Sequence, residues 1–142
     1  MATDKEIIDS LKLDWLPSDY YNYYDLNRVE NAINVVKNRV AEFKGIVVTI
    51  TSPVTNRTRS SYIFASDLNR IETNIQRLKL TFAEGYDFPD MKTDWKYNDP
   101  FSFADARRYE QILYDMYYTI ENNISNVPYA GQLYAGQLGV VY

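Results

Sequence analysis

The feature that most constrains this sequence is a nine-residue phrase that occurs twice. Residues 25–33 read DLNRVENAI and residues 67–75 read DLNRIETNI, while residues 105–113 carry a looser third copy, DARRYEQIL. An Asp-Trp pair precedes the first copy at residues 14–15 and the third copy at residues 94–95. Copies spaced about 40 residues apart indicate a repeated packing unit. The repeat is therefore informative about the fold before it is informative about function.

Apolar residues recur in alternating steps of three and four through each copy, which is typical of a helix with one buried stripe. The stripes are Leu26, Val29, Ile33, Val36, Val40 and Phe43; then Leu68, Ile71, Ile75, Leu78 and Phe82; then Ala106, Tyr109, Leu113, Met116 and Ile120. They predict a mainly α fold in which three long heptad-patterned helices form a bundle. We expect these helices at about residues 22–44, 66–83 and 103–125, with Ser66 and Ser102 as caps and Gly45 ending the first. A capping box at Thr3 predicts a further short helix that ends near Leu13.

The segment between the first two long helices has a different character. Residues 46–51 are rich in β-branched side chains, and residues 60–64 could pair with them, so a small β-hairpin is expected here. Charges beside the stripes favour an antiparallel arrangement of the first two long helices, because it would place Glu30 opposite Lys79. The third helix would then cover the groove between them.

Composition argues against catalysis. The chain has no cysteine and no histidine, which removes the thiolate nucleophile, the commonest general base and the commonest metal ligand. The loop aspartates Asp87, Asp90, Asp94 and Asp99 lack the spacing of an EF-hand, so a solvated acidic loop is the favoured interpretation. We therefore expect no enzyme activity, no cofactor and no metal.

Charge and hydropathy limit the partners. A formal net charge of −4 argues against nucleic acid, and no apolar run is long enough for membrane insertion. The first residues lack the order of a signal peptide, so we expect synthesis in the cytoplasm.

Tyrosine is unusually abundant, with 14 residues in the chain. Tyr21 and Phe101 are expected to pack against the first turns of their helices. The other aromatic residues cannot all face inward, and tyrosine is favoured at protein interfaces. The candidate interaction surface is Trp15, Tyr20, Tyr23, Tyr24, Trp95, Tyr117, Tyr118, Tyr129 and Tyr134. Contact with proteins is the favoured role, and stacking on sugar rings is the alternative.

The sequence divides into two regions. Residues 1–128 are expected to form a single helical domain with three degenerate repeats at about 14–44, 57–84 and 94–125. Residues 129–142 contain Tyr-Ala-Gly-Gln-Leu twice in succession and are expected to form an extended C-terminal arm. This arm is either a flexible end or a strand that pairs with a sheet edge of a neighbouring subunit.

The pattern Asp-Trp, spacer, Asp-Leu-Asn-Arg-(Val/Ile)-Glu-x-x-Ile resembles helical segments in tail, baseplate and appendage proteins of phages and prophages of Gram-positive bacteria. The resemblance implies a non-enzymatic, multimeric virion protein that is made in the host cytoplasm and binds other virion proteins. Some of the proteins it resembles bind host-surface saccharides. A carbohydrate-binding attachment module is therefore the alternative function, and a soluble host-side adaptor is a third.

Overall fold

The computed structural model describes residues 3–82 and 88–133, and side chains as far as residue 122. Its helices are α1 (Asp4–Asp9), α2 (Tyr23–Lys44), α3 (Ala65–Lys79) and α4 (Phe103–Leu133). The mainly α prediction is confirmed. The expected set of three long helices is wrong, because the described chain has four helices and α3 spans only 15 residues. The short helix α1 begins at the predicted capping box and ends before Leu13.

The aspartate of the repeated phrase sets the start of each long helix. Its carboxylate accepts the backbone N–H of the residue that precedes the helix: Asp25 from Asn22 at 2.6 Å, Asp67 from Phe64 at 2.8 Å, and Asp105 from Ser102 at 3.0 Å. A carboxylate there also lies near the positive end of the helix dipole. The cap predicted at Ser102 is confirmed, whereas Ser66 lies inside the first turn of α3. At the other end of α2, Gly45 adopts the left-handed conformation predicted for it, with φ of 69°.

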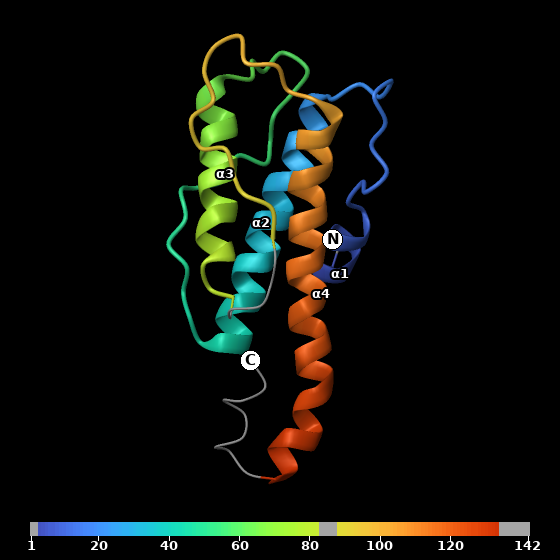
Figure 1. Ribbon diagram of the computed structural model, residues 1–142, viewed down its shortest axis with the longest axis vertical. Helices are drawn as coiled ribbons and strands as arrows, with labels where there is room; N and C mark the ends of the chain where they lie inside the picture. Colours follow the sequence, from blue (N-terminus) through green and yellow to red (C-terminus); the bar gives the residue numbers. More distant parts are fainter. Residues whose placement is uncertain (1–2, 83–87, 134–142) are drawn as a thin grey trace.

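Helices α2, α3 and α4 are parallel, and Figure 1 shows all of them starting at the same end of the bundle. Contacts at both ends agree with this direction: Glu30 pairs with Arg70 near the helix starts, and Lys44 donates to the carbonyl of Thr81 near the helix ends at 2.6 Å. The antiparallel prediction is therefore wrong. It treated Glu30 as an exposed charge, but this side chain is fully buried and is bound by an arginine of the neighbouring helix.

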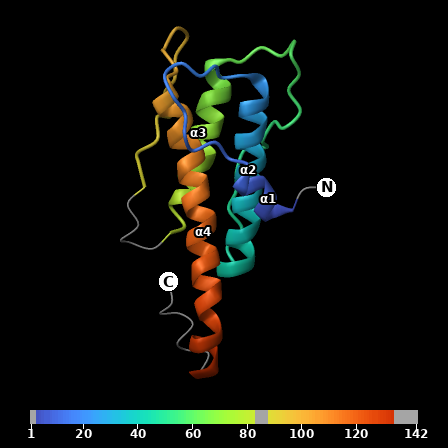
Figure 2. The ribbon, with the colours of Figure 1, turned by 90° about the vertical axis from the view of Figure 1, so that its right-hand side faces the viewer.

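Parallel helices require the chain to return along the bundle after α2 and again after α3 (Figures 1 and 2). The first return segment is extended, as its β-branched residues favour, but the described residues contain no strand and the predicted β-hairpin is wrong. Thr51 pairs with a helix instead: the side-chain amide of Asn74 accepts its N–H at 2.9 Å and donates to its C=O at 2.8 Å. Residues 58–61 then form a turn before α3 begins.

The predicted apolar stripes form the core. One residue of each stripe illustrates this: Leu26, Ile71 and Leu113 are fully buried in α2, α3 and α4. Phe43, Leu68 and Phe82 are only partly buried and pack at its margins. The core is thus built from the helix faces that the three-and-four spacing selects.

The N-terminal helix and the end of α4 complete the fold. Helix α1 packs against α2 and α4, and the hydroxyl of Tyr118 donates to Asp9. Helix α4 continues to Leu133, so residues 129–133 are helical and the predicted extended arm is wrong for them. Residues 134–142, including Tyr134, lie outside the described residues.

Candidate functional site

The polar residues of the repeated phrase meet in three buried clusters, the first of which is centred on Glu110 of α4. Its Oε1 accepts the N–H of Lys12 at 2.9 Å and Nε of Arg28 at 2.6 Å. Its Oε2 accepts the indole N–H of Trp15 at 2.6 Å and Nη2 of Arg28 at 3.0 Å. The carboxylate is fully buried, and these four bonds bring the segment before α2, and α2 itself, onto α4.

Glu72 of α3 is the centre of the second cluster, which repeats this geometry. Its Oε1 accepts the N–H of Lys92 and Nη1 of Arg108, both at 2.6 Å. Its Oε2 accepts the indole N–H of Trp95, Nη2 of Arg108 at 3.3 Å and the hydroxyl of Tyr109 at 2.6 Å. The segment before α4 therefore binds α3 as the segment before α2 binds α4.

Glu30 of α2 is the centre of the third cluster, where an arginine replaces the tryptophan. Arg57 donates to Oε2 of Glu30 at 2.5 Å, and Arg70 donates through Nε at 3.1 Å and through Nη2 at 2.8 Å. Sequence reasoning missed Arg57. Its spacing could have identified it. Arg57 lies ten residues before Asp67, and Trp15 likewise lies ten residues before Asp25, so the two residues occupy equivalent positions of the repeat.

A second contact recurs between each helix and the segment that begins the next repeat. The side chain of Asn27 accepts the backbone N–H of Arg57 at 3.0 Å and donates to its C=O at 3.1 Å. Asn69 does the same for Trp95 at 2.6 and 3.0 Å. The equivalent position of α4 is Arg107, which donates to the C=O of Trp15 at 2.6 Å. The first, third, fourth and sixth positions of the phrase thus have defined structural roles.

Together the clusters form what we call the Glu–Arg ring: Glu30, Glu72 and Glu110, each bound by the arginine of another long helix. Helix α3 binds α2, α4 binds α3, and α2 binds α4, so the ring is closed. The ring fixes both the direction and the register of the helices, because each arginine must lie level with its partner. Buried carboxylates that are saturated with donors are suited to holding structure and not to transferring protons.

Electrostatics keep the arginines of the ring charged. Burial lowers the pKa of Arg28, but the hydrogen bond to Glu110 and its charge outweigh this effect, so the pKa lies above its ordinary value. The balance is the same for the pKa of Arg108 beside Glu72. Neither guanidinium loses its proton in the range where the protein is folded.

The ring makes alkaline stability depend on a buried phenol. Burial raises the pKa of Tyr109 well above its ordinary value of 10.0, and the charge of Glu72 raises it further. Above about pH 10 the folded state therefore keeps on Tyr109 a proton that the same residue loses in the unfolded chain, and this contribution to the free energy of unfolding should fall as pH rises. This stabilisation is fully present below that pH. Chemical denaturation at stepped alkaline pH checks it, and Tyr109→Phe should flatten the decline; an unchanged slope would contradict the assignment.

The structure divides the predicted interaction residues. Trp15 and Trp95 are only 2% and 5% exposed and hold the ring, so neither lies on the surface. Tyr117 is buried, and Tyr23 and Tyr118 are partly buried. Tyr20 is 86% exposed and Tyr24 is 54% exposed. Of the remaining two, Tyr129 lies near the end of α4, with its side chain outside the described residues, and Tyr134 lies outside them entirely.

Exposed aromatic residues gather where the long helices begin. We call this surface the aromatic end and define it by Tyr20, Tyr62, Phe64 and Tyr97, which are 86%, 81%, 62% and 89% exposed. Tyr62, Phe64 and Tyr97 were not among the residues predicted for the interaction surface. The repeat could have identified Tyr62. It lies five residues before Asp67, and Tyr20 likewise lies five residues before Asp25.

The aromatic end rests on a packed aromatic layer. The ring centroids of Tyr21 and Phe101 lie 4.9 Å apart, those of Trp15 and Tyr21 lie 5.1 Å apart, and those of Trp95 and Phe101 lie 5.7 Å apart. Tyr21 and Phe101 therefore join the repeats to one another, in addition to covering their own helices. The exposed rings above them are supported by a rigid base.

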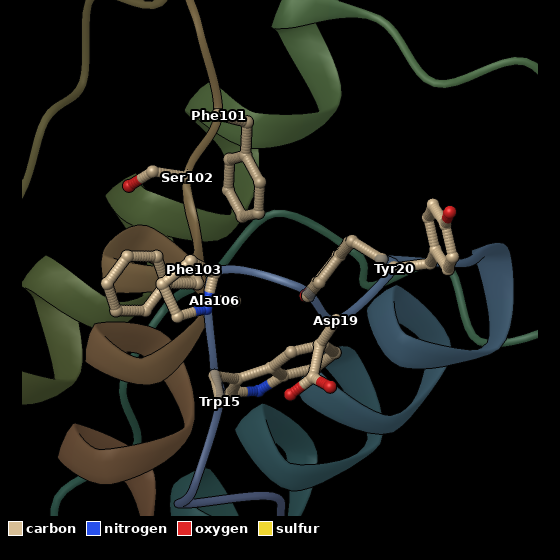
Figure 3. Close-up of a pocket in the computed structure, with 9 residues that line it drawn as sticks. Trp15, Asp19, Tyr20, Phe101, Ser102, Phe103 and Ala106 are labelled. Atoms are coloured by element: carbon tan, nitrogen blue, oxygen red, sulfur yellow. The ribbon is translucent and has the colours of Figure 1, made fainter.

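Two hollows occur at equivalent places in this end. The first, of about 300 Å³, lies between the turn at residues 16–19 and the start of α4, and Figure 3 shows Trp15 and Phe101 on opposite sides of it. The second, of about 540 Å³, lies between the turn at residues 96–99 and the start of α3. Tyr62, Phe64 and Tyr97 line the larger one.

The described residues offer neither a metal site nor a membrane-spanning helix. They contain no group of three acidic, histidine or cysteine side chains that could hold a metal ion; of the loop aspartates, Asp87 lies outside them. None of the helices in the described part of the chain is long and apolar enough to cross a membrane.

The fold and the Glu–Arg ring define a class: a parallel three-helix domain built from three repeats, with a short N-terminal helix added. No protein-family model, no curated protein and no solved structure was found to match the chain.

Proposed function

We propose that this protein is a non-enzymatic structural component that binds other proteins through its aromatic end. The single observation that carries the proposal is the gathering of four exposed aromatic side chains, each more than 60% exposed, at one end of a rigid bundle. Burying apolar area stabilises a contact by roughly 25 cal/mol per Å², and tyrosine and phenylalanine supply large area at low entropic cost.

The interior supports the same proposal. The buried charges that would be the first candidates for catalysis are each bound by two or more donors within the Glu–Arg ring. A bundle joined in this way presents its ends in a fixed geometry, which suits a part of a larger assembly. The resemblance of the repeated phrase to phage tail, baseplate and appendage proteins supports the virion as that assembly.

A photo-crosslinking residue at Tyr97 tests the proposal. The matched control carries the same residue at Asn38, which is exposed on α2 away from the aromatic end. In cells that produce the particles, position 97 should form a specific adduct that sediments with them, and position 38 should not. Equal crosslinking from both positions, or no adduct in the sedimented particles, would refute the proposal.

Carbohydrate binding is the second candidate, and the hollows favour it. Tyr20 and Asp19 border the first hollow, and Tyr97 and Asp99 border the second. Aromatic faces beside carboxylates are suited to stacking on sugar rings and accepting their hydroxyl protons. Retention on cell-wall polysaccharide that is lost in Tyr97→Ala would support this function. Trp95→Ala would not test it, because Trp95 is buried and holds Glu72.

A further inference from the structure

The segment after α2 has an open backbone edge. Residues 46–50 read Ile-Val-Val-Thr-Ile, lie in neither a helix nor a strand, and begin the segment that runs back along the bundle in Figure 1. Within the described part of the chain, the only hydrogen bond made by their backbone groups is from Arg77 to the carbonyl of Thr49 at 3.3 Å. Backbone groups of an extended segment that lack protein partners can accept an added strand.

The side chains of this segment are arranged as in an edge strand. Val48 is buried and Ile50 packs against the core, whereas Val47 is 76% exposed and Thr49 is exposed. One face is therefore anchored to the bundle, and the other, formed by Val47 and Thr49, is open. The return segments of the other repeats read SLKLD at residues 10–14 and FPDMKTD at residues 88–94, and neither contains a β-branched run. Composition thus singles out residues 46–50 as the strand former.

The chain contains a matching segment. Residues 138–142 read Leu-Gly-Val-Val-Tyr, and like residues 46–50 they carry no charge. After α2 and α3 the chain returns beside the bundle, but the equivalent path between α4 and α2 is already occupied. Lys12 and Trp15 of the N-terminal segment bind Glu110 there. The N-terminal segment therefore fills beside α4 the path that the return segments take after α2 and α3.

We propose that residues 138–142 of one copy add as a β-strand to residues 46–50 of a second copy. Residues 134–142 can span up to about 30 Å when extended, which is enough to reach a neighbouring molecule from the end of α4. Figure 1 shows that α4 ends towards the same end of the bundle at which residues 46–50 begin. The contact lies opposite the aromatic end and does not rest on the function proposed above.

Hydrogen exchange of the amides of residues 46–50 tests the proposal. In the full chain these amides should exchange about tenfold more slowly as protein concentration rises, and a chain ending at Leu133 should lose this protection. Adding a peptide of residues 134–142 to the shortened chain should restore it. Protection that is absent, or that does not depend on concentration, would overturn the proposal.

Two controls separate strand pairing from loose apolar contact. Two N-methylated peptides keep all their side chains but lose backbone N–H donors on opposite edges of the strand. One is methylated at Leu138 and Val140, and the other at Gly139 and Val141. One should fail to protect residues 46–50 and the other should succeed, whereas equal behaviour would contradict pairing.

Discussion

Replacing Glu72 with alanine should lower the free energy of unfolding by about 3–5 kcal/mol, because the substitution removes the buried carboxylate to which Arg108, Trp95 and Tyr109 all donate. Glu72 accepts from Arg108, Trp95, Tyr109 and the backbone of Lys92, and no solvent reaches it. Small domains are stable by roughly 5–15 kcal/mol, so the variant should be close to unfolding at room temperature. Urea denaturation followed by far-ultraviolet circular dichroism measures the loss.

Glu42→Ala is the matched control. Glu42 also pairs with an arginine, Arg39 at 3.0 Å, but its side chain is 60% exposed. An exposed pair of this kind contributes about 0.2–1 kcal/mol, so the control should stay near wild type. A Glu72→Ala variant as stable as Glu42→Ala would show that the Glu–Arg ring does not hold the bundle together.

The second large effect is expected for Trp15→Ala, which should cost about 3–5 kcal/mol because it leaves a cavity in a packed region. Trp15 is 2% exposed, lies 5.1 Å from Tyr21 between ring centroids, and donates its indole N–H to Glu110. The same denaturation measurement applies. This change should destabilise the fold, whereas loss of an exposed binding residue would leave stability unchanged.

Trp15→Phe separates packing from hydrogen bonding. Phenylalanine keeps most of the apolar volume but removes the donor to a buried carboxylate, so a smaller loss of about 1–3 kcal/mol is expected. Tyr20→Ala, at an 86% exposed position, should change stability by less than about 0.5 kcal/mol. If Trp15→Ala behaved like Tyr20→Ala, the interior placement of the tryptophan would be wrong.

Local sequence was a good guide to elements whose cause is local. The three-and-four spacing of Leu26, Ile71 and Leu113 predicted which helix faces are buried, since burial of a helix depends on its own periodicity. The caps at Thr3 and Ser102 and the end at Gly45 were also predicted, because a cap involves residues within one turn. The β-hairpin failed because an extended run says nothing about its partner, which proved to be Asn74 of a helix.

The candidate site was only partly predictable. Tyr20 and Tyr24 were correctly expected on the surface, but the two tryptophans were not recognised as interior residues. A tryptophan flanked by polar residues has the same local pattern whether it stacks on a partner or donates to a buried carboxylate. Only the position of Glu110, 95 residues from Trp15 in sequence, distinguishes these roles.

The sequence by itself determined that three related helices would form and which of their faces would exclude water. It also placed an Asp, an Arg and a Glu at the same level of each helix. Only the tertiary structure decided that the helices run parallel, because that choice depends on whether each glutamate faces solvent or the arginine of another helix. The glutamates are buried, and a carboxylate removed from water must find its donors within the protein. Pairing with the arginine of another helix therefore fixes the parallel direction.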